Sequence, residues 1–266
     1  MPATSQESYY SGQRTPLSSN LAIILLPAHS LVLLFSMNKL FPNQHESTSV
    51  PDVVWILGAG QCGHRAAELL RKVSPQTLIY VVEKRRTLDF PDDIETMHAD
   101  GIEWLAEHFT PGSVVTMIIP ALPVHLAAAW LKIKLSEQQS EARSVEIPQS
   151  LVDQLPNPIR LSDSTVTTSK ADFLCPPHCS EPDEYCSYTG KRRSLPLHDF
   201  LESMECGIFE QLIVRSRQFA PGVGGFFPDD LWNLLEKARL KAEIPLLVGT
   251  ACKCHGIIDG IIHRTL

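Results

Sequence analysis

The amino-acid sequence predicts an α/β protein built on a doubly wound, mostly parallel, Rossmann-like sheet with a Cys-rich insertion of loops and hairpins. Three observations lead to this prediction. Short apolar runs alternate with amphipathic stretches, a glycine-rich turn follows the first apolar run, and chemically unusual residues gather where the apolar runs end. Because ligands bind beyond the carboxyl ends of the strands in such sheets, we expect one site at that edge.

The first part of the chain has a regular order of strand, turn and helix. Val53–Leu57 is apolar and precedes the glycine turn, and Ser74-Pro75 ends the following helix because proline cannot continue the hydrogen-bond ladder. Further buried parallel strands are expected at 77–82, 94–98 and 114–119, and helices at 61–73, 102–109 and 126–135.

Residues 136–205 differ in character, since they are rich in serine, proline and charge and contain only short apolar runs. We expect hairpins and loops there rather than a second core. The alternation then returns, with strands at 212–214 and 245–248, a helix at 229–240 and a short closing helix at 256–263. The predicted organisation is an N-terminal extension 1–50, a dinucleotide-binding βαβ half 51–135, a Cys-rich insertion 136–205 and a second α/β half 206–266 that completes the sheet.

We expect the N-terminal extension to be poorly structured or apolar, and it contains the apolar segment LAIILLPAHSLVLLFSM at 21–37. This segment has the length of a signal-peptide core but falls short of the ~20 residues of a membrane span. Three interpretations stay open: Met37 is the true start of the protein, the segment associates with a membrane, or it is a signal peptide.

Composition narrows the class of protein. The chain has 266 residues, 44% of them hydrophobic, and a net charge of −7 argues against a general nucleic-acid surface, which needs a positive field. Of the seven cysteines, most lie in two tight clusters, which indicates metal ligands or redox thiols before structural disulfides. We therefore expect a cytoplasmic protein in a reducing compartment.

The glycine turn, Gly58-Ala-Gly-Gln-Cys-Gly63, is a GxGxxG motif between a strand and a helix. Glu83 ends the next strand about 20 residues further on, which strengthens the motif. Gly58 would allow the tight turn, Gly60 the approach of a pyrophosphate, and Gly63 the contact between helix and strand. The alternative is a turn that only packs a helix on a strand.

Residues around the turn would determine whether NAD or NADP binds. Glu83 would accept hydrogen bonds from an adenosine ribose and favours NAD, whereas the basic run Lys84-Arg-Arg86 would suit the 2′-phosphate of NADP. Asp100 either lines the adenine side or only forms a turn, and Cys62 is either a reactive thiol or a small packing residue. The cofactor-binding candidates are Gly58, Gly60, Gln61, Cys62, Gly63, Glu83, Asp100 and Pro120.

Residues 53–125 resemble the nucleotide-binding domain of TrkA-type regulators of potassium transport. The resemblance is carried by GAGQCG, by Glu83 and by the HADG segment at 98–101. Nearly everything after residue 50 also resembles an uncharacterised bacterial family of Rossmann proteins that are often labelled as potassium transporters. Its matching segments here are DFLCPPHCSEPDEYC, RSRQFAPGVGG and TACKCHG. The resemblance implies dinucleotide binding and a sensor that regulates a membrane transporter.

The clustered cysteines are candidate metal ligands. Three lie in the insertion, and two follow the last expected strand, so they would reach the crevice edge. Zinc or an iron–sulfur cluster needs four ligands, and the spacing does not choose between them. The alternative is free thiols or local disulfides, while Cys206, in an apolar stretch, is expected in the core. The metal-ligand candidates are Cys175, Cys179, Cys186, Cys252 and Cys254, with His178 and His255 in reserve.

Three further residues have candidate roles. Arg215 and Arg217 would hold a small anionic substrate, since guanidinium groups bind such groups bidentately, or they are surface arginines paired with acidic residues. His125 is a candidate catalytic acid–base group facing a nicotinamide, or a residue that caps the following helix.

The leading functional hypothesis is an NAD(P)-binding Rossmann protein with a cysteine-ligated zinc or iron–sulfur centre, acting as an oxidoreductase. One alternative is a non-enzymatic nucleotide or redox sensor that regulates a potassium transporter. A second is a metal-stapled structural or assembly protein. The expected partners are a dinucleotide and, as further options, a small anionic substrate, a membrane transporter and a second copy of the chain.

Overall fold

The computed structural model describes residues 51–85, 89–137 and 140–265. The chain divides into two units, Met1–Thr48 and Ser49–Leu266, and every described residue belongs to the second. The apolar segment 21–37 therefore lies outside the described residues. Within the described ranges, no helix combines the length and the apolar character that crossing a membrane requires.

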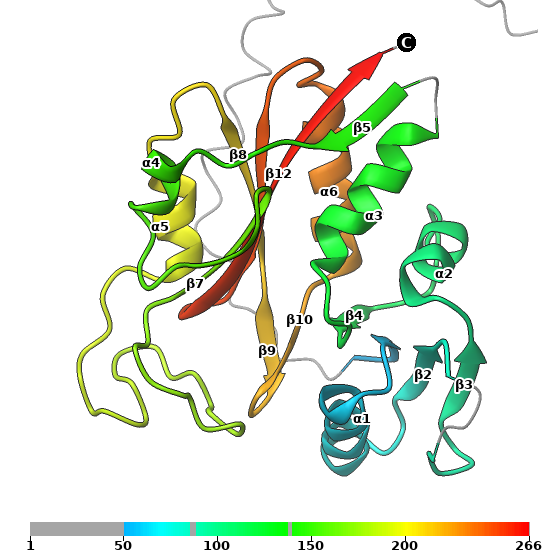
Figure 1. Ribbon diagram of the computed structural model, residues 1–266. Coiled ribbons are helices and arrows are strands. Elements are labelled where there is room, and N and C mark those ends of the chain that lie inside the picture. Colours follow the sequence, from blue (N-terminus) through cyan, green and yellow to red (C-terminus); the bar gives the residue numbers. More distant parts are fainter. Residues whose placement is uncertain (1–50, 86–88, 138–139, 266) are drawn as a thin grey trace, which may run out of the picture. The chain divides into compact units, whose positions relative to one another are not determined.

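The first sheet is parallel and four-stranded. Its members are β1 (Val53–Leu57), β2 (Leu78–Glu83), β3 (Glu95–His98) and β4 (Met117–Pro120), in the order β3-β2-β1-β4 (Figure 1). All three pairings are parallel. The strands expected in this part of the chain are confirmed, and the α/β class with them.

Helices pack on both faces of this sheet, so β1 is buried on both sides. Val54 and Ile56 share an apolar core with α1 (Gln61–Val73). Trp55 and Leu57, which alternate with them, face a second core that contains α2 (Gly101–His108) and α3 (Leu126–Ser136). A parallel strand that is buried on both faces is apolar throughout, which is why the run Val53–Leu57 shows no polar alternation.

The second half of the chain forms a separate sheet, so the prediction that residues 206–266 complete the first sheet is wrong. The six strands follow the order β6-β7-β12-β11-β8, with β5 also paired to β12. Only β8 and β11 are parallel, and the other pairs are antiparallel. The strands are β5 (Ser140–Ser144), β6 (Ile159–Ser162), β7 (Thr165–Ser169), β8 (Glu210–Arg215), β11 (Leu246–Ala251) and β12 (His255–Thr265).

The expected closing helix at 256–263 is also wrong, because these residues lie in β12, the long strand at the centre of the second sheet. Close contact with neighbouring strands explains its glycines. A Cβ on Gly260 would overlap the carbonyl oxygen of Val145, and one on Gly256 would lie 3.1 Å from the Cβ of Ala251. Apolar pairs on a strand with two buried faces imitate the spacing of a short helix.

The expected insertion does contain a hairpin, β6–β7, and a long loop, but contrary to the prediction it is part of the second sheet and contributes to a second apolar core. It supplies β5, β6 and β7 and two short helices, α4 (Gln149–Val152) and α5 (Leu197–Ser203). Ile147, Leu151 and Leu201 share a buried cluster with Leu247 of β11. The stretch between β7 and α5 has neither helix nor strand, and it carries the three cysteines of the insertion.

A hairpin made of β9 (Arg217–Ala220) and β10 (Val223–Gly225) leads from the second sheet back to the first. Phe226, just before α6 (Pro228–Arg239), exchanges two 3.0 Å backbone hydrogen bonds with Ile118 of β4 in an antiparallel bridge. Because the pairing is antiparallel, the turn of the hairpin at Gly222 extends toward the carboxyl end of β4. The helix α1 contacts both strands of the hairpin.

Candidate functional site

The glycine turn between β1 and α1 needs glycine at two of its positions for steric reasons. Gly58 has a φ of +109°, and a Cβ there would lie 2.5 Å from the carbonyl oxygen of Ala121. A Cβ on Gly63 would overlap the carbonyl oxygen of Gly58. At Gly60 a Cβ would meet nothing within 4 Å, so this position opens onto free space.

Glu83 holds the glycine turn from the end of β2. Its carboxylate accepts a 2.9 Å hydrogen bond from the N–H of Ala59, while the Arg85 guanidinium donates to the carbonyl oxygen of Ala59 at 2.7 Å. Burial alone would raise the pKa of Glu83, but the Ala59 N–H and the side chain and N–H of Arg85 outweigh it and lower the pKa to about 2. The carboxylate is therefore charged and oriented at the turn.

The remaining predicted cofactor residues lie around this turn. Gln61 and Cys62 begin α1 and are exposed, and the N-cap residue Gly60 offers no side chain to the helix. Asp100 caps α2, accepting hydrogen bonds from the N–H groups of Ile102 and Glu103 at 3.0 and 3.3 Å. Pro120 ends β4 opposite Leu57. The carboxyl ends of β1, β2 and β4 thus meet at one edge.

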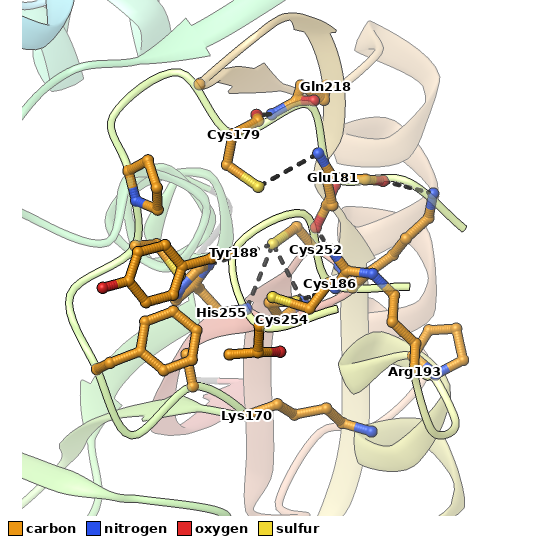
Figure 2. A pocket seen from close by; sticks show the side chains of 18 of the residues that line it. Lys170, Cys179, Glu181, Cys186, Tyr188, Arg193, Gln218, Cys252, Cys254 and His255 are labelled. Carbon is orange, nitrogen blue, oxygen red and sulfur yellow. Dashed lines mark hydrogen bonds between the residues drawn. The ribbon is translucent and has the colours of Figure 1, made fainter. Parts of the chain in front are cut away.

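The five predicted metal-ligand cysteines line one pocket of about 750 Å³. The cysteine loop, defined as residues 170–196, contributes Cys175, Cys179 and Cys186, and the turn between β11 and β12 contributes Cys252 and Cys254. Figure 2 shows four of these side chains around the same space, with His255 beside them. The prediction that the two cysteine clusters meet is confirmed. Of the reserve ligands, His255 lines the pocket, whereas His178 is exposed and is not among its lining residues.

Three of the thiols accept backbone hydrogen bonds from residues two or three positions further on. The Cys252 sulfur accepts from the N–H groups of Cys254 and His255 at 3.4 and 3.3 Å. The Cys179 sulfur accepts from the N–H of Glu181 at 3.4 Å. The Cys186 sulfur accepts from the side chain of Thr189 and from the N–H groups of Thr189 and Tyr188, and these bonds lower its pKa. Each of the three turns therefore presents its sulfur to the pocket with N–H dipoles aimed at it.

The fourth and fifth thiols have other surroundings. Arg193 donates a side-chain hydrogen bond to the Cys254 sulfur, and burial raises the pKa of Cys254 although Arg193 opposes this. Burial, followed by the charges of Cys254, Cys179 and Cys186, raises the pKa of Cys175. In the described ranges, no three side chains of Cys, His, Asp or Glu are spaced as they stand to hold a metal ion.

Sequence analysis missed the charged residues of this pocket. Arg193 contacts Cys254, and the carboxylate of Glu181 accepts the N–H of Lys253 at 2.8 Å. Lys253 also pairs with Asp183, and Lys170 lies within the electrostatic range of Cys254. Proximity to the cysteines in the sequence was the one signal for them, since each lies within ten residues of a cluster member.

The β9–β10 hairpin connects the cysteine pocket to the glycine turn. The carbonyl oxygen of Cys179 accepts hydrogen bonds from the N–H of Gly222 at 3.1 Å and from the side chain of Gln218 at 2.6 Å. A Cβ on Gly222 would overlap the carbonyl oxygen of Pro177, so the cysteine loop lies directly on the hairpin turn. On its other side, Ala220 and Val223 share one apolar core with Ala59 and Ala66.

The two candidate anion-binding arginines have protein partners. Arg217 forms a 2.6 Å ion pair with Asp230 and lies over the ring of Phe227. Arg215 is close enough to Asp183 to contribute to the lowered pKa of that carboxyl, after the larger effect of Lys253. This pairing agrees with the alternative interpretation, in which the arginines pair with acidic residues.

His125 links the two sheets and is buried. Its Nδ1 atom lies 2.7 Å from the carboxylate of Asp259 on β12, and its Nε2 atom lies 2.8 Å from the hydroxyl of Thr250 on β11. Asp259 also accepts a 2.7 Å hydrogen bond from Thr165. Both ring nitrogens are thus occupied by the protein, which does not fit an acid–base group that faces a nicotinamide. The helix-cap alternative is confirmed in position only, since His125 is the N-cap residue of α3 but its side chain makes no capping bond to the helix.

The fold and the pocket define an α/β protein with a glycine turn on one sheet and a cysteine-lined pocket beside it. The chain belongs to the family described as "Uncharacterized protein, C-terminal domain", which matches residues 127–264, more than half of the chain. An uncharacterised protein of Archaeoglobus fulgidus is 27% identical over 221 residues, which cover 77% of this chain and 97% of that protein. No solved structure matches the chain. The matched family range contains α3 except for its first residue, and all six strands of the second sheet except for the last residue of β12.

Proposed function

We propose that the protein binds NAD or NADP at the glycine turn, carries a cysteine-ligated metal centre in the neighbouring pocket, and acts in oxidation and reduction. The observation that carries the proposal is the β9–β10 hairpin, which touches α1 on one side and the cysteine loop on the other. A dinucleotide on the turn and a metal in the pocket would be neighbours across this hairpin.

The support for a dinucleotide comes from the geometry of the turn. The strand order β3-β2-β1-β4 is that of the first four strands of a doubly wound dinucleotide-binding sheet. The open position at Gly60 leaves space for a phosphate, and the first N–H groups of α1 have no side-chain cap that would compete for it. The carboxylate of Glu83 favours NAD over NADP, and so does the hydrogen bond that the Arg85 guanidinium donates to the carbonyl oxygen of Ala59.

The support for a metal centre comes from the convergence of five thiols from two distant segments. Free thiols packed together gain little from one another, since each thiolate raises the pKa of the next. A metal ion removes this repulsion and links the cysteine loop to the β11–β12 turn. The cationic side chains of Lys170, Arg193 and Lys253 would offset the negative charge of a thiolate-rich centre.

The test of the nucleotide half is a titration of the full chain with NADH and NADPH, followed by fluorescence or calorimetry. Gly60→Ala adds a methyl group to open space at an ordinary φ, so the fold should keep its stability while affinity for the dinucleotide falls by about 10-fold or more. The matched control is Gln61→Ala, which alters the next, exposed position and keeps the turn. No binding by wild type, or equal binding by Gly60→Ala, contradicts the proposal.

A second measurement separates an enzyme from a sensor. With an electron-accepting dye present, an oxidoreductase transfers two electrons from NADH to the dye, and the absorbance of reduced nicotinamide disappears. A non-enzymatic sensor that regulates a transporter binds NADH without consuming it.

A further inference from the structure

The pocket holds more thiols than one tetrahedral metal ion accepts. Tetrahedral thiolate sites use four ligands, whereas five cysteines line this pocket. Building on the proposed metal centre, we infer that Cys175, Cys179, Cys186 and Cys252 bind one zinc-type ion and that Cys254 stays outside its coordination shell, held by Arg193.

The backbone hydrogen bonds identify three of the ligands. The sulfurs of Cys179, Cys186 and Cys252 each accept at least one N–H from residues two or three positions further along the chain. Such bonds fix the direction of the sulfur. At Cys252, burial and the carboxylate of Glu181 outweigh them and raise the pKa of the thiol to about 12, so the geometry of the bonds and not the charge of the thiol supports this assignment. Gly190, with a φ of +67°, donates its N–H to the carbonyl oxygen of Cys186 at 2.8 Å and closes the turn that follows this cysteine.

The fourth ligand is Cys175 on two grounds. Three residues separate Cys175 from Cys179, which falls within the usual spacing of paired zinc ligands, whereas a single residue separates Cys252 from Cys254. Among the described residues, none donates a hydrogen bond to the Cys175 sulfur, and its thiol lies within the electrostatic range of Cys254 as well as of the proposed ligands Cys179 and Cys186.

Cys254 is already compensated by protein groups. The Arg193 guanidinium donates a hydrogen bond to its sulfur, and the Lys170 ammonium group interacts electrostatically with the same thiol. The N–H of Cys254 is committed to the Cys252 sulfur at 3.4 Å, so Cys254 supports a ligand through its backbone. Because an Arg193–Cys254 ion pair is neutral overall, it would add no further negative charge beside a divalent ion with four thiolates, whose net charge is already −2.

Binding would require the four sulfurs to close around the ion. As they stand, the described side chains are not spaced for coordination. Cysteine has one side-chain torsion to adjust, and the cysteine loop has no helix or strand that would resist a small shift. Ion binding would thereby attach this loop to the β11–β12 turn.

The experiment is a titration of the full metal-free chain with Co²⁺, a spectroscopic substitute for Zn²⁺, under reducing and anaerobic conditions. Wild type should bind one Co²⁺ with the visible bands of a tetrahedral site and a strong sulfur-to-cobalt charge-transfer band. Ser substitutions at Cys175, Cys179, Cys186 or Cys252 should each weaken affinity by more than about 10-fold, and Cys254→Ser should stay within about two-fold of wild type.

Two controls separate lost ligands from lost folding. Cys206→Ser alters a buried cysteine outside the pocket and should leave Co²⁺ affinity unchanged. Cys186→His restores a ligand and should recover binding with a weaker charge-transfer band, because one sulfur has been replaced by nitrogen.

The outcomes distinguish the assignment from the proposed function. If Cys254→Ser loses the ion and Cys175→Ser keeps it, the ligand assignment is wrong while the metal centre stands. If anaerobically purified wild type contains iron and sulfide with visible absorbance, the zinc-type ion is wrong. If wild type binds no metal at all, the metal half of the proposed function fails, and the dinucleotide titration decides the other half.

Discussion

The glycine turn and the cysteine pocket lie on opposite sides of one hairpin but are built in different ways. The turn is a continuous stretch whose shape depends on contacts between backbone atoms, such as those of Gly63 with Gly58. The pocket is assembled from the cysteine loop, the hairpin and the β11–β12 turn, and thiols line it. Contacts within the protein, including the hydrogen bond from Ala59 to Glu83, hold the turn in place, whereas we expect the shape of the pocket to depend on the proposed metal ion.

The largest expected effect tests the rigidity of the turn. Gly63→Ala should lower the free energy of unfolding by about 3 kcal/mol or more, because its Cβ would overlap a backbone oxygen that cannot move without disturbing β1. In the cysteine loop, Leu174→Ala removes a side chain that is 95% exposed and should change stability by less than about 0.5 kcal/mol. Chemical denaturation of both variants measures the contrast, and equal effects would contradict it.

Metal removal should act on the pocket alone. At a free metal concentration about 100 times its Kd, the ion should stabilise the folded chain by about 2.7 kcal/mol, and a chelator should abolish this gain. Hydrogen exchange should then accelerate in the cysteine loop, while β1 and α1 stay protected. Faster exchange throughout both regions would show that the turn also depends on the pocket.

The bond between Glu83 and the turn should depend on pH. The folded pKa of about 2 lies below the ordinary value of 4.5, so the stabilisation is complete above pH 4.5 and is lost as pH falls toward 2. Glu83→Gln should therefore cost about 1.5–3 kcal/mol at pH 7 and progressively less in acid. Urea unfolding of both proteins across this range measures the difference. A cost that does not vary with pH would contradict the ionic role of Glu83.

The smallest expected effect concerns a link between the two regions. Thr250 lies on β11, two residues before Cys252, and hydrogen-bonds His125, which follows β4. Thr250→Val keeps the shape and removes the hydroxyl, and it should cost about 1 kcal/mol. Thermal unfolding of this variant and of Thr250→Ser, which retains the hydroxyl, isolates that bond. Equal losses in the two variants would assign the cost to packing instead.

The first half of the fold could be predicted because its order is local. The strands β1, β2 and β3 are neighbours both in the sequence and in the sheet, and only β4 crosses back to pair with β1. In the second half, β12 pairs with the preceding strand β11 but also with β5 and β7, which come from much earlier parts of the chain. Nothing in the pattern of residues 256–263 distinguishes a two-faced central strand from a short helix.

The parts of the candidate site that could be predicted are those in which the type and spacing of the residues identify their role. Glycines in a GxGxxG motif and clustered cysteines are recognisable in a sequence, and the two cysteine groups do meet. The partners of Arg217 and His125 were not predictable, because Asp230 and Asp259 reach them only through the tertiary fold. An exposed arginine and a buried one look alike in a sequence, as do a catalytic histidine and one that links two sheets.

One aromatic contact has a practical consequence for producing parts of this protein. Phe109, which lies before the matched family range, stacks on Trp232 within it, with ring centroids 4.6 Å apart. Both rings belong to a hydrophobic cluster that extends from Val53 to Ile261. A fragment limited to residues 127–264 would present this cluster to water, so we expect it to aggregate unless residues 51–126 are expressed with it.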